Sequence, residues 1–313
     1  MPLSFDEKVV KVSRDLVSAL QSTGKHPGYR PAHARGILLS GTFTPSADAK
    51  LLTSAPHFSQ TSTPILVRFS SSTGIPNIPD TDPNANPRGL AIRFQLSHGA
   101  HTDIITHSTP FFPTRTGAEF LEFLGAAGAS GPGAASPSPI EKFLGTHPAA
   151  LAFVQAPKPS PASFAKGAYF GVTALRFMNS DGSSAYFRYR VIPDGGVENL
   201  DGDALRGKSS DFLFDEIQER ILKGPVTMTV VAQLAEKTDV VDDATVHWPE
   251  SRPIVELGKI EIKAVEPNNA KEQKHIIFDP IPRVEGIAPS ADPLLEVRAS
   301  VYLISGRERR AAR

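Results

Sequence analysis

The first apolar residues of the chain recur with the period of a helix. They lie three or four positions apart, and they are Phe5, Val9, Val12, Leu16 and Leu20. This spacing places them on one face and predicts an amphipathic helix over residues 5–22. Ser4 and Glu7 stand three positions apart, as in a capping box at a helix N-terminus. Gly24 then ends the predicted helix.

Beyond this helix, most apolar residues fall in short or alternating runs separated by turn-rich segments, a pattern that predicts β-strands. The runs cover residues 35–42, 64–71, 89–96, 102–106, 168–177, 184–193, 225–235 and 255–264. Helical patterns cover residues 117–125, 138–146, 210–223 and 293–305. The segment between the first two of these helices, AAGASGPGAASPS, is rich in small residues and is predicted to be a loop.

Strands and helices in this order predict an α+β fold. About eight antiparallel strands, with helices at both ends and inserted between them, fit a closed barrel as well as a sandwich. No shift in composition divides the chain, so we expect one domain over residues 1–313, with an N-terminal helix within 1–24 and a C-terminal helix and basic tail over 293–313.

Composition and charge narrow the classes of function. The 33 basic residues balance 33 acidic ones, so no net positive field attracts nucleic acid or an anionic membrane. The chain has no cysteine, which excludes disulfides, thiolate metal sites and a cysteine nucleophile. No run approaches the roughly 20 apolar residues of a membrane span. We find neither the apolar core of a signal peptide nor a targeting tripeptide, and we expect a cytoplasmic protein.

Two strand-like segments carry polar residues on one face. In VRFS (67–70), Arg68 and Ser70 point to one side of the predicted strand, and Val67 and Phe69 point to the other. Taken alone, this alternation favours a surface strand whose polar face lies in water. The segment LAIRFQL (90–96) is equally consistent with a half-exposed sheet.

Near the C-terminus, Arg298 and Tyr302 stand four residues apart in a predicted helix, so their side chains share one face. A guanidinium beside a phenol favours the phenolate. Tyrosinate is one of the few axial ligands that proteins offer to haem iron. Taken alone, however, this spacing is more typical of an ordinary polar pair on a helix.

The histidines are weak signals when each is taken separately. In RPAHARG (30–36), His33 stands between arginines ahead of an apolar run, which favours a polar residue at the start of a strand. Asp242, Asp243 and His247 resemble a metal site, but a solvated loop followed by a buried Trp248 fits that segment better. Surface or capping roles are predicted for the other histidines, which are His26, His57, His98, His101, His147 and His275.

Several motifs taken together, in order and in spacing, resemble the catalase family. They are RPAHARG, VRFS, DPNANPRGLAIRFQL, HSTPFFPTRTGAEFLEFL and, near the C-terminus, RASVY. The nearest likeness is to the short catalase-related haem peroxidases, and it runs from about residue 26 to the end of the chain. The resemblance implies an antiparallel eight-stranded β-barrel with surrounding and inserted helices, and haem b buried between the barrel and a helix.

The resemblance also implies roles for single residues. His33 matches the distal acid and base that moves a proton between the two oxygens of a peroxide, and Ser70 matches its hydrogen-bond partner. Tyr302 matches the proximal iron ligand, and Arg298 matches the arginine that keeps it ionised. The matching haem-binding positions are Arg30, Arg68 and Arg309 for the propionates, Phe120 for the ring stacked on the haem and Phe112 for the pocket wall.

One position departs from the family pattern. The family usually places an asparagine in the distal pocket, and alignment on Pro110 puts His107 there. An asparagine amide donates a hydrogen bond to peroxide without taking its proton. An imidazole can do either, or can approach the iron. We therefore count His107 among the catalytic candidates.

The sequence thus predicts a haem b peroxidase that acts on hydrogen peroxide or organic hydroperoxides and then oxidises a small organic co-substrate. One alternative is a catalase-like enzyme that rearranges or oxygenates one specific hydroperoxide or secondary metabolite. The other is a haem-binding protein without turnover, in which His107 closes the peroxide site. The family tends to oligomerise, so a homodimer is a further expectation.

Overall fold

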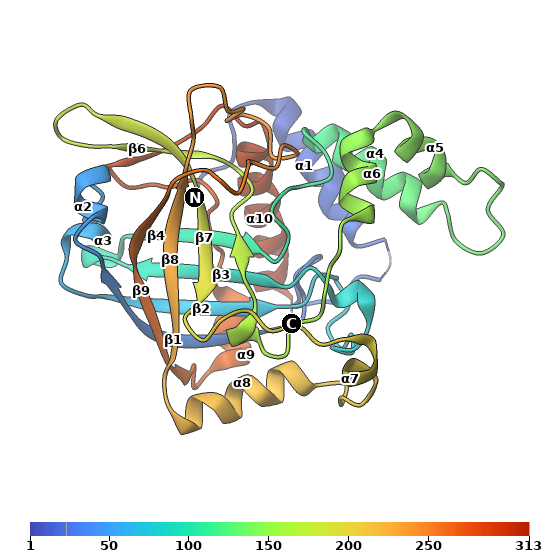
Figure 1. Ribbon diagram of the computed structural model, residues 1–313. Coiled ribbons are helices and arrows are strands. Elements are labelled where there is room, and N and C mark those ends of the chain that lie inside the picture. The colour runs from blue at the N-terminus through green and yellow to red at the C-terminus, as the bar shows by residue number, and fades with distance from the viewer. Residues whose placement is uncertain (23, 313) are drawn as a thin grey trace.

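Eight antiparallel strands form a closed ring in the computed structural model, which describes residues 1–22 and 24–312. In ring order they are β1 (Gly36–Pro45), β2 (Thr63–Ser70), β3 (Gly89–Gln95), β4 (His101–His107), β5 (Tyr169–Phe170), β7 (Ser184–Pro193), β8 (Val226–Leu234) and β9 (Ile254–Val265). The pairing of β9 with β1 and of β7 with β8 closes the ring (Figure 1). The α+β prediction is confirmed, and the strands form a barrel rather than a sandwich.

The predicted strand over 168–177 is wrong in one respect, because it is split into β5 and β6 (Leu175–Met178). Both pieces pair with β7, Phe170 with Arg190 and Leu175 with Phe187. The chain advances five residues from Phe170 to Leu175 while β7 advances only three, from Phe187 to Arg190. The residues between β5 and β6 therefore cannot all pair with β7. A further short strand, β10 (Ile287–Pro289), pairs with β6 and extends the sheet.

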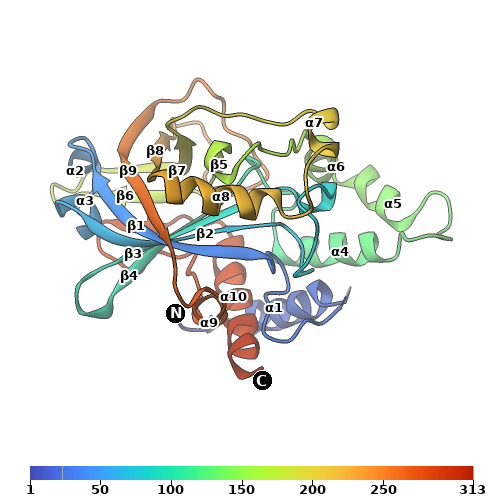
Figure 2. The ribbon, with the colours of Figure 1, turned by 90° about the horizontal axis from the view of Figure 1, so that it is seen from below.

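Three helices pack together beside the barrel: α1 (Glu7–Leu20), α4 (Gly117–Gly128) and α10 (Leu294–Ala311) (Figures 1 and 2). Leu16 and Val17 of α1 and Val297 and Val301 of α10 form the centre of this contact. Helices α5 (Pro139–Thr146) and α6 (Pro148–Gln155) continue from α4, and α8 (Phe212–Lys223) packs against β9. The shorter helices are α2 (Ala49–Leu52), α3 (Pro56–Ser59), α7 (Gly202–Arg206) and α9 (Asn269–His275), with 3-10 turns at Pro83–Ala85, Ser97–Gly99 and Phe164–Lys166.

Both terminal helices differ from the sequence prediction at their ends. The predicted capping box is wrong, because Asp6 caps α1 by accepting from the N–H of Lys8, while the Ser4 hydroxyl donates to Glu296. Helix α10 extends past its predicted end at residue 305, through Gly306. A Cβ at Gly306 would lie 2.4 Å from the Ile277 side chain, so this glycine serves close packing instead of ending the helix. Thr23 and Arg313, the last residue of the predicted basic tail, lie outside the described residues.

The barrel is filled by apolar side chains from alternate strand positions. Aromatic rings contribute to this core, among them Phe43, Phe58, Phe94 and Phe177. His57 lies in the same core and is 0% exposed, with its ring 4.0 Å from that of Phe58. The predicted surface or capping role of His57 is therefore wrong.

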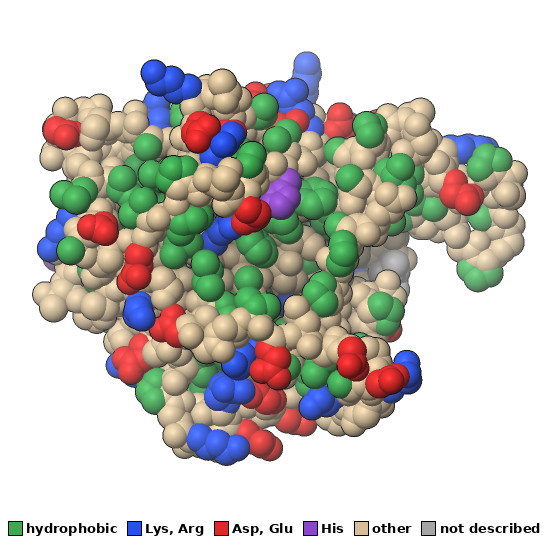
Figure 3. All heavy atoms as spheres, in the orientation of Figure 1, with side chains coloured by type: hydrophobic (Ala, Val, Ile, Leu, Met, Phe, Trp, Pro, Cys, Tyr) green, Lys and Arg blue, Asp and Glu red, His purple; other side chains and the backbone are tan. Residues whose placement is uncertain are grey.

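The outer surface carries no strong single-sign field on the face seen in Figure 3, where acidic and basic side chains are interspersed. This agrees with the balanced charge of the sequence. Within residues 1–22 and 24–312, none of the helices has the length and apolar character needed to cross a membrane.

Candidate functional site

One row of residues crosses four strands on the outer face of the barrel. In the ladder, Gly36 of β1 pairs with Ser70 of β2, Ser70 pairs with Gly89 of β3, and Gly89 pairs with His107 of β4. Adjacent strands lie about 4.8 Å apart, so the backbone of Gly89 separates Ser70 from His107 by about 10 Å. The row places a hydroxyl and an imidazole on either side of a residue without a side chain.

His33 lies in the segment before β1 and contacts this row at Gly89. Its Nδ1 is 3.1 Å from the Ser70 hydroxyl oxygen. A Cβ on Gly89 would stand 2.9 Å from the same nitrogen, so glycine is needed there to leave space for the imidazole. The backbone of His33 is left-handed, with φ of 54°. Its N–H donates to the Ser72 carbonyl and its carbonyl accepts from Arg68, both at 2.9 Å, which holds this uncommon conformation. We call His33, Ser70, Gly89, His107 and Thr109 the histidine site.

His107 ends β4 and is engaged through one ring nitrogen. Its Nδ1 lies 2.6 Å from the Thr109 hydroxyl oxygen and 3.3 Å from the Thr109 backbone nitrogen. In the described part of the chain, Nε2 has no hydrogen-bond partner. His107 lies close enough to His33 for the charge of His33 to lower its pKa.

Both imidazoles of the histidine site are neutral at ordinary pH. Burial lowers the pKa of His33 to about 4, and the positive charges of Arg68, Arg30 and Arg298 act in the same direction. Burial likewise lowers the pKa of His107 to about 3, with further contributions from Arg298 and His33. Neutral imidazoles can accept a proton or donate a hydrogen bond, which suits acid and base chemistry.

The polar face of β2 does not lie in water. Arg68 and Ser70 are each only 4% exposed, so the interpretation of VRFS as a surface strand is wrong. Arg68 Nε donates to the Gln273 side chain of α9 at 2.8 Å. It also lies close enough to Arg309 of α10 to be influenced by its charge. The covering helices come from the end of the chain.

Three arginines gather at the C-terminal end of α9, and we call Arg30, Arg68 and Arg309 the arginine cluster. Arg30 donates to the carbonyls of Gln273 and Ile276 at 3.1 and 3.0 Å. Arg309 donates to the carbonyls of Lys274 and Ile276 at 2.9 and 2.7 Å. These carbonyls lie at a helix C-terminus, where they lack partners within the helix.

The arginine cluster contains no acidic partner among the described residues. The ionisable neighbours of Arg30 are Arg68, Arg309 and Tyr302. Burial and this repulsion hold the pKa of Arg30 well below its ordinary value, and burial lowers that of Arg68 to about 9 and of Arg309 to about 10. Buried like charges are costly unless an anion compensates them. The donor set therefore fits a ligand that carries carboxylates.

Tyr302 lies on α10 beside the arginine cluster. Arg298 Nη2 donates to the Tyr302 hydroxyl at 3.4 Å, as expected for residues one helical turn apart. Arg298 Nη1 donates to Thr173 at 3.5 Å. Both Arg298 and Tyr302 are half-buried. Since Tyr302 acts on Arg30, and Arg30 and Arg298 act on His33, all of these groups share one region between the barrel and α10.

The two predicted aromatic residues contact each other at the edge of this region. The rings of Phe112 and Phe120 are 4.9 Å apart between centroids and are tilted by 53°. Phe120 packs against the cluster of α1 and α10 that also contains Tyr302. Phe112 packs against the smaller cluster that includes Leu294, the first residue of α10.

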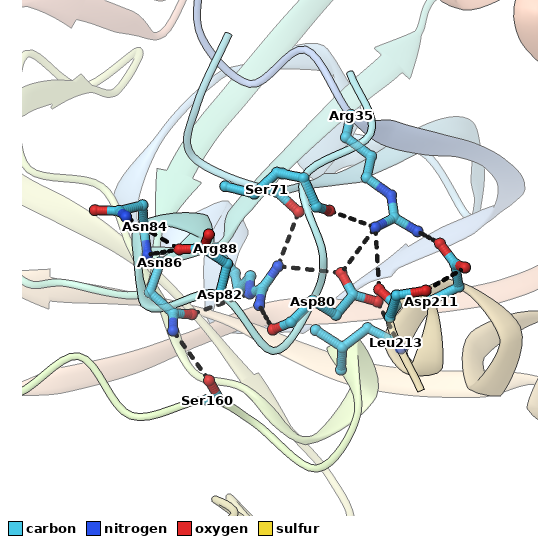
Figure 4. A network of polar contacts seen from close by, with 12 residues as sticks. Arg35, Ser71, Asp80, Asp82, Asn84, Asn86, Arg88, Ser160, Asp211 and Leu213 are labelled. Carbon is cyan, nitrogen blue, oxygen red and sulfur yellow. Dashed lines mark hydrogen bonds and ion pairs between the residues drawn. The ribbon is translucent and has the colours of Figure 1, made fainter. Parts of the chain in front are cut away.

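A buried ion pair, formed by Asp80 and Arg88, contacts residues that adjoin the row of strand residues in the sequence (Figure 4). Asp80 and Arg88 are both 0% exposed, and Arg88 Nη1 lies 3.3 Å from the Asp80 carboxylate. Arg88 also donates to the Ser71 hydroxyl at 2.8 Å. Its backbone N–H donates to the Ser108 hydroxyl, and its carbonyl accepts from the Ser108 N–H. The pair thus ties together the residues that directly follow Ser70 and His107.

The remaining predictions for histidines and acidic residues have mixed outcomes. His26, His98, His101, His247 and His275 are exposed, and Trp248 is buried, as predicted. His147 is half-buried and stacks on Phe143. Asp242 pairs with Arg115 at 3.1 Å. Among the described residues, no group of three or more histidines and carboxylates is arranged to hold a metal ion.

Sequence reasoning missed several residues that support the site. Gly89 stands in the quoted motif DPNANPRGLAIRFQL, but its closeness to His33 depends on strand register. Asp80, Thr109 and Gln273 give no sequence signal, because each acts through a partner that is fixed only by the fold.

The fold and the site together define a closed antiparallel barrel with a buried ionisable region under a C-terminal helix. The chain belongs to the catalase family, whose model, described as "Catalase", matches residues 25–313. It is 35% identical over 293 residues to a catalase-related peroxidase of Mycolicibacterium paratuberculosis, with 92% of both chains covered. It is 31% identical to a catalase-related peroxidase of Synechococcus elongatus, with 94% of this chain and 87% of that one covered.

Solved structures agree on the fold. Catalase A from Saccharomyces cerevisiae superposes with a TM-score of 0.78 at 23% identity, over 98% of this chain and 65% of that one. A fungal catalase superposes with a TM-score of 0.77, over 93% of this chain and 62% of that one. The chain therefore spans less than two thirds of these larger proteins. The predicted family and fold are confirmed, as is the class of enzyme at the level of the family.

Proposed function

We propose that the chain is a haem peroxidase that cleaves the O–O bond of hydrogen peroxide or an organic hydroperoxide and oxidises a small organic co-substrate. The observation that carries this proposal is the convergence of the histidine site, the arginine cluster and Tyr302 on one side of the barrel. The similarity to two catalase-related peroxidases supports it.

The side chains present fit haem b. The arginine cluster would hold the two propionates, because it has no acidic partner among the described residues. Tyr302 would bind the iron, with Arg298 stabilising the phenolate at the distance of a weak hydrogen bond. Phe112 and Phe120 would form part of the apolar surroundings. When bound, haem with a tyrosinate ligand supplies the redox chemistry of peroxide reduction.

In this proposal His33 moves a proton within the bound peroxide. Its neutral imidazole takes the proton from one oxygen and returns it to the other, so that the second oxygen leaves as water or an alcohol. The Ser70 hydroxyl, 3.1 Å from Nδ1, orients the ring. Burial, and after it the surrounding arginines, lowers the pKa of His33 to about 4, so its base form is available above that pH.

The test measures peroxide consumption by the purified haem-loaded protein. Hydrogen peroxide, cumene hydroperoxide and a fatty-acid hydroperoxide are each supplied with and without a chromogenic electron donor. Donor-dependent consumption supports the peroxidase. Consumption of one organic hydroperoxide without a donor, with a rearranged product, supports the alternative of a specific rearrangement. If no peroxide is consumed under any condition, the proposal fails.

The optical spectrum distinguishes the enzyme from a haem-binding protein without turnover. A high-spin ferric spectrum of the tyrosinate type is expected for an open site. A six-coordinate low-spin spectrum that is lost on substitution of His107 would show that this imidazole closes the site. A purified protein that binds no haem would contradict both.

A further inference from the structure

The contact between His107 and Thr109 determines which ring nitrogen carries the hydrogen. Thr109 is 1% exposed, so its backbone N–H cannot be satisfied by bulk water. Among the described residues, its one acceptor is Nδ1 of His107, at 3.3 Å. A backbone amide can only donate. Nδ1 must therefore present its lone pair to Thr109.

The neutral ring then has its hydrogen on Nε2. An uncharged imidazole carries one hydrogen, on one nitrogen only. If that hydrogen were on Nδ1, it would face the N–H of Thr109, and the buried amide would lose its partner. The Thr109 hydroxyl, 2.6 Å from Nδ1, can donate to the same lone pair. The neutrality of His107 follows from burial, which lowers its pKa to about 3.

The surroundings of His33 differ from those of His107. Among the described residues, its ring contacts the Ser70 hydroxyl, 3.1 Å from Nδ1, and a hydroxyl can either donate or accept. This contact does not fix which ring nitrogen of His33 carries the hydrogen. The two imidazoles therefore differ, because the tautomer of His107 is set by a backbone amide and that of His33 is not.

We propose that His107 is a fixed hydrogen-bond donor in the histidine site, positioned by the backbone of Thr109, and that it stabilises the peroxide oxygens without exchanging a proton with them. This inference rests on the proposed function, because it assigns a role within the same reaction. Thr109 acts here as a positioning residue.

The first experiment compares His107→Asn with His107→Leu in the haem-loaded enzyme. Asparagine keeps an N–H donor and cannot act as a base, so kcat for peroxide cleavage should stay within about fivefold of the parent. Leucine removes the donor, and the loss should be about 10²- to 10³-fold, as for deletion of one oxyanion donor. His101→Asn, on the exposed end of the same strand, is the matched control. Equal losses for asparagine and leucine would overturn the inference, because His107 would then be needed as a base.

The second experiment observes the hydrogen directly. A neutron structure of the deuterium-exchanged holoenzyme should show deuterium on Nε2 of His107 and none on Nδ1. Deuterium on Nδ1 would overturn the inference even if the enzyme cleaves peroxide. Conversely, a protein with deuterium on Nε2 that consumes no peroxide would contradict the proposed function and leave the assigned tautomer standing.

Discussion

The burial and contacts of single residues in the site depend on partners that are distant in the sequence. Strand alternation correctly placed Arg68 and Ser70 on one face, but alternation does not say what covers that face. One of the side chains that cover this face is Gln273, which is 205 residues beyond Arg68 in the sequence. The family motifs thus predict candidate positions, whereas the burial of these side chains and the supporting contacts of Thr109 and Gly89 required the fold.

The first prediction concerns the phenol oxygen of Tyr302. Tyr302→Phe keeps the ring that packs against α1 and α10 but removes the proposed iron ligand and the contact with Arg298. We expect the haem-to-protein ratio to fall and the optical spectrum of any remaining haem to change. Tyr186→Phe, on β7, controls for the loss of a phenol elsewhere. Unchanged haem content together with an unchanged spectrum would show that Tyr302 is not the ligand.

A second prediction at this scale concerns His33 as the acid and base. His33→Ala should retain haem, because its proposed contacts with the cofactor are not ligating. It should lose peroxide cleavage by about 100-fold or more, the range expected on removal of a general acid or base. The measurement is single-turnover peroxide cleavage at pH 7. The exposed His26→Ala serves as control, and a His33→Ala rate equal to that of this control would remove His33 from the mechanism.

At the scale of elements, the barrel strands were predictable because hydrophobic alternation is a local property. The break between β5 and β6 could not be predicted, because the two strands together form one apolar run in the sequence. Only the pairing with β7 shows that the residues between them have no partner in the ladder. The length of α10 was underestimated for a similar reason: Gly306 looks like a helix end, yet its contact with Ile277 requires the absence of a side chain.

The Asp80–Arg88 pair gives an element-scale prediction, because it joins the segments that follow β2 and β4. Asp80→Asn would leave Arg88 buried without a counter-charge, which typically costs about 3–5 kcal/mol of stability. We expect a lower urea midpoint and weaker peroxide cleavage, since the Arg88 side chain that donates to Ser71 would lose the carboxylate that holds it in place. The matched substitution Asp203→Asn breaks the exposed pair with Arg206 and should change the midpoint little. Equal midpoints for the two variants would show that the buried pair does not hold these segments.

For the molecule as a whole, overall charge balance conceals a local concentration of positive charge. The sequence has equal numbers of basic and acidic residues, 33 of each. It could not show that Arg30, Arg68 and Arg309 meet in the interior with no acidic partner among the described residues. These arginines are far apart in the sequence, and only the fold brings them together. The same interior keeps His33, His57 and His107 uncharged, and their lowered pKa values make the free energy of unfolding depend on pH.

Burial lowers the pKa of His57 to about 3, as it lowers those of His33 and His107. The unfolded chain binds protons at these residues near pH 6.5, whereas the folded chain does not. Their contribution to stability is therefore complete above pH 6.5 and is lost as the pH falls toward their folded pKa values. Burial raises the pKa of Asp80 and Asp292, which acts in the opposite direction, so a single variant is needed to isolate one histidine.

His57→Leu is that variant, because among the described residues neither ring nitrogen of His57 has a hydrogen-bond partner inside the aromatic core. At pH 8 the leucine variant should be more stable by about 1–3 kcal/mol, since no buried polar atom is left unpaired. At pH 5 the advantage should grow by about 2 kcal/mol, because the parent alone then gains a proton at this position on unfolding. Urea unfolding at the two pH values measures both quantities. An advantage that stays constant with pH would mean that His57 is already protonated in the folded protein or is not buried as described.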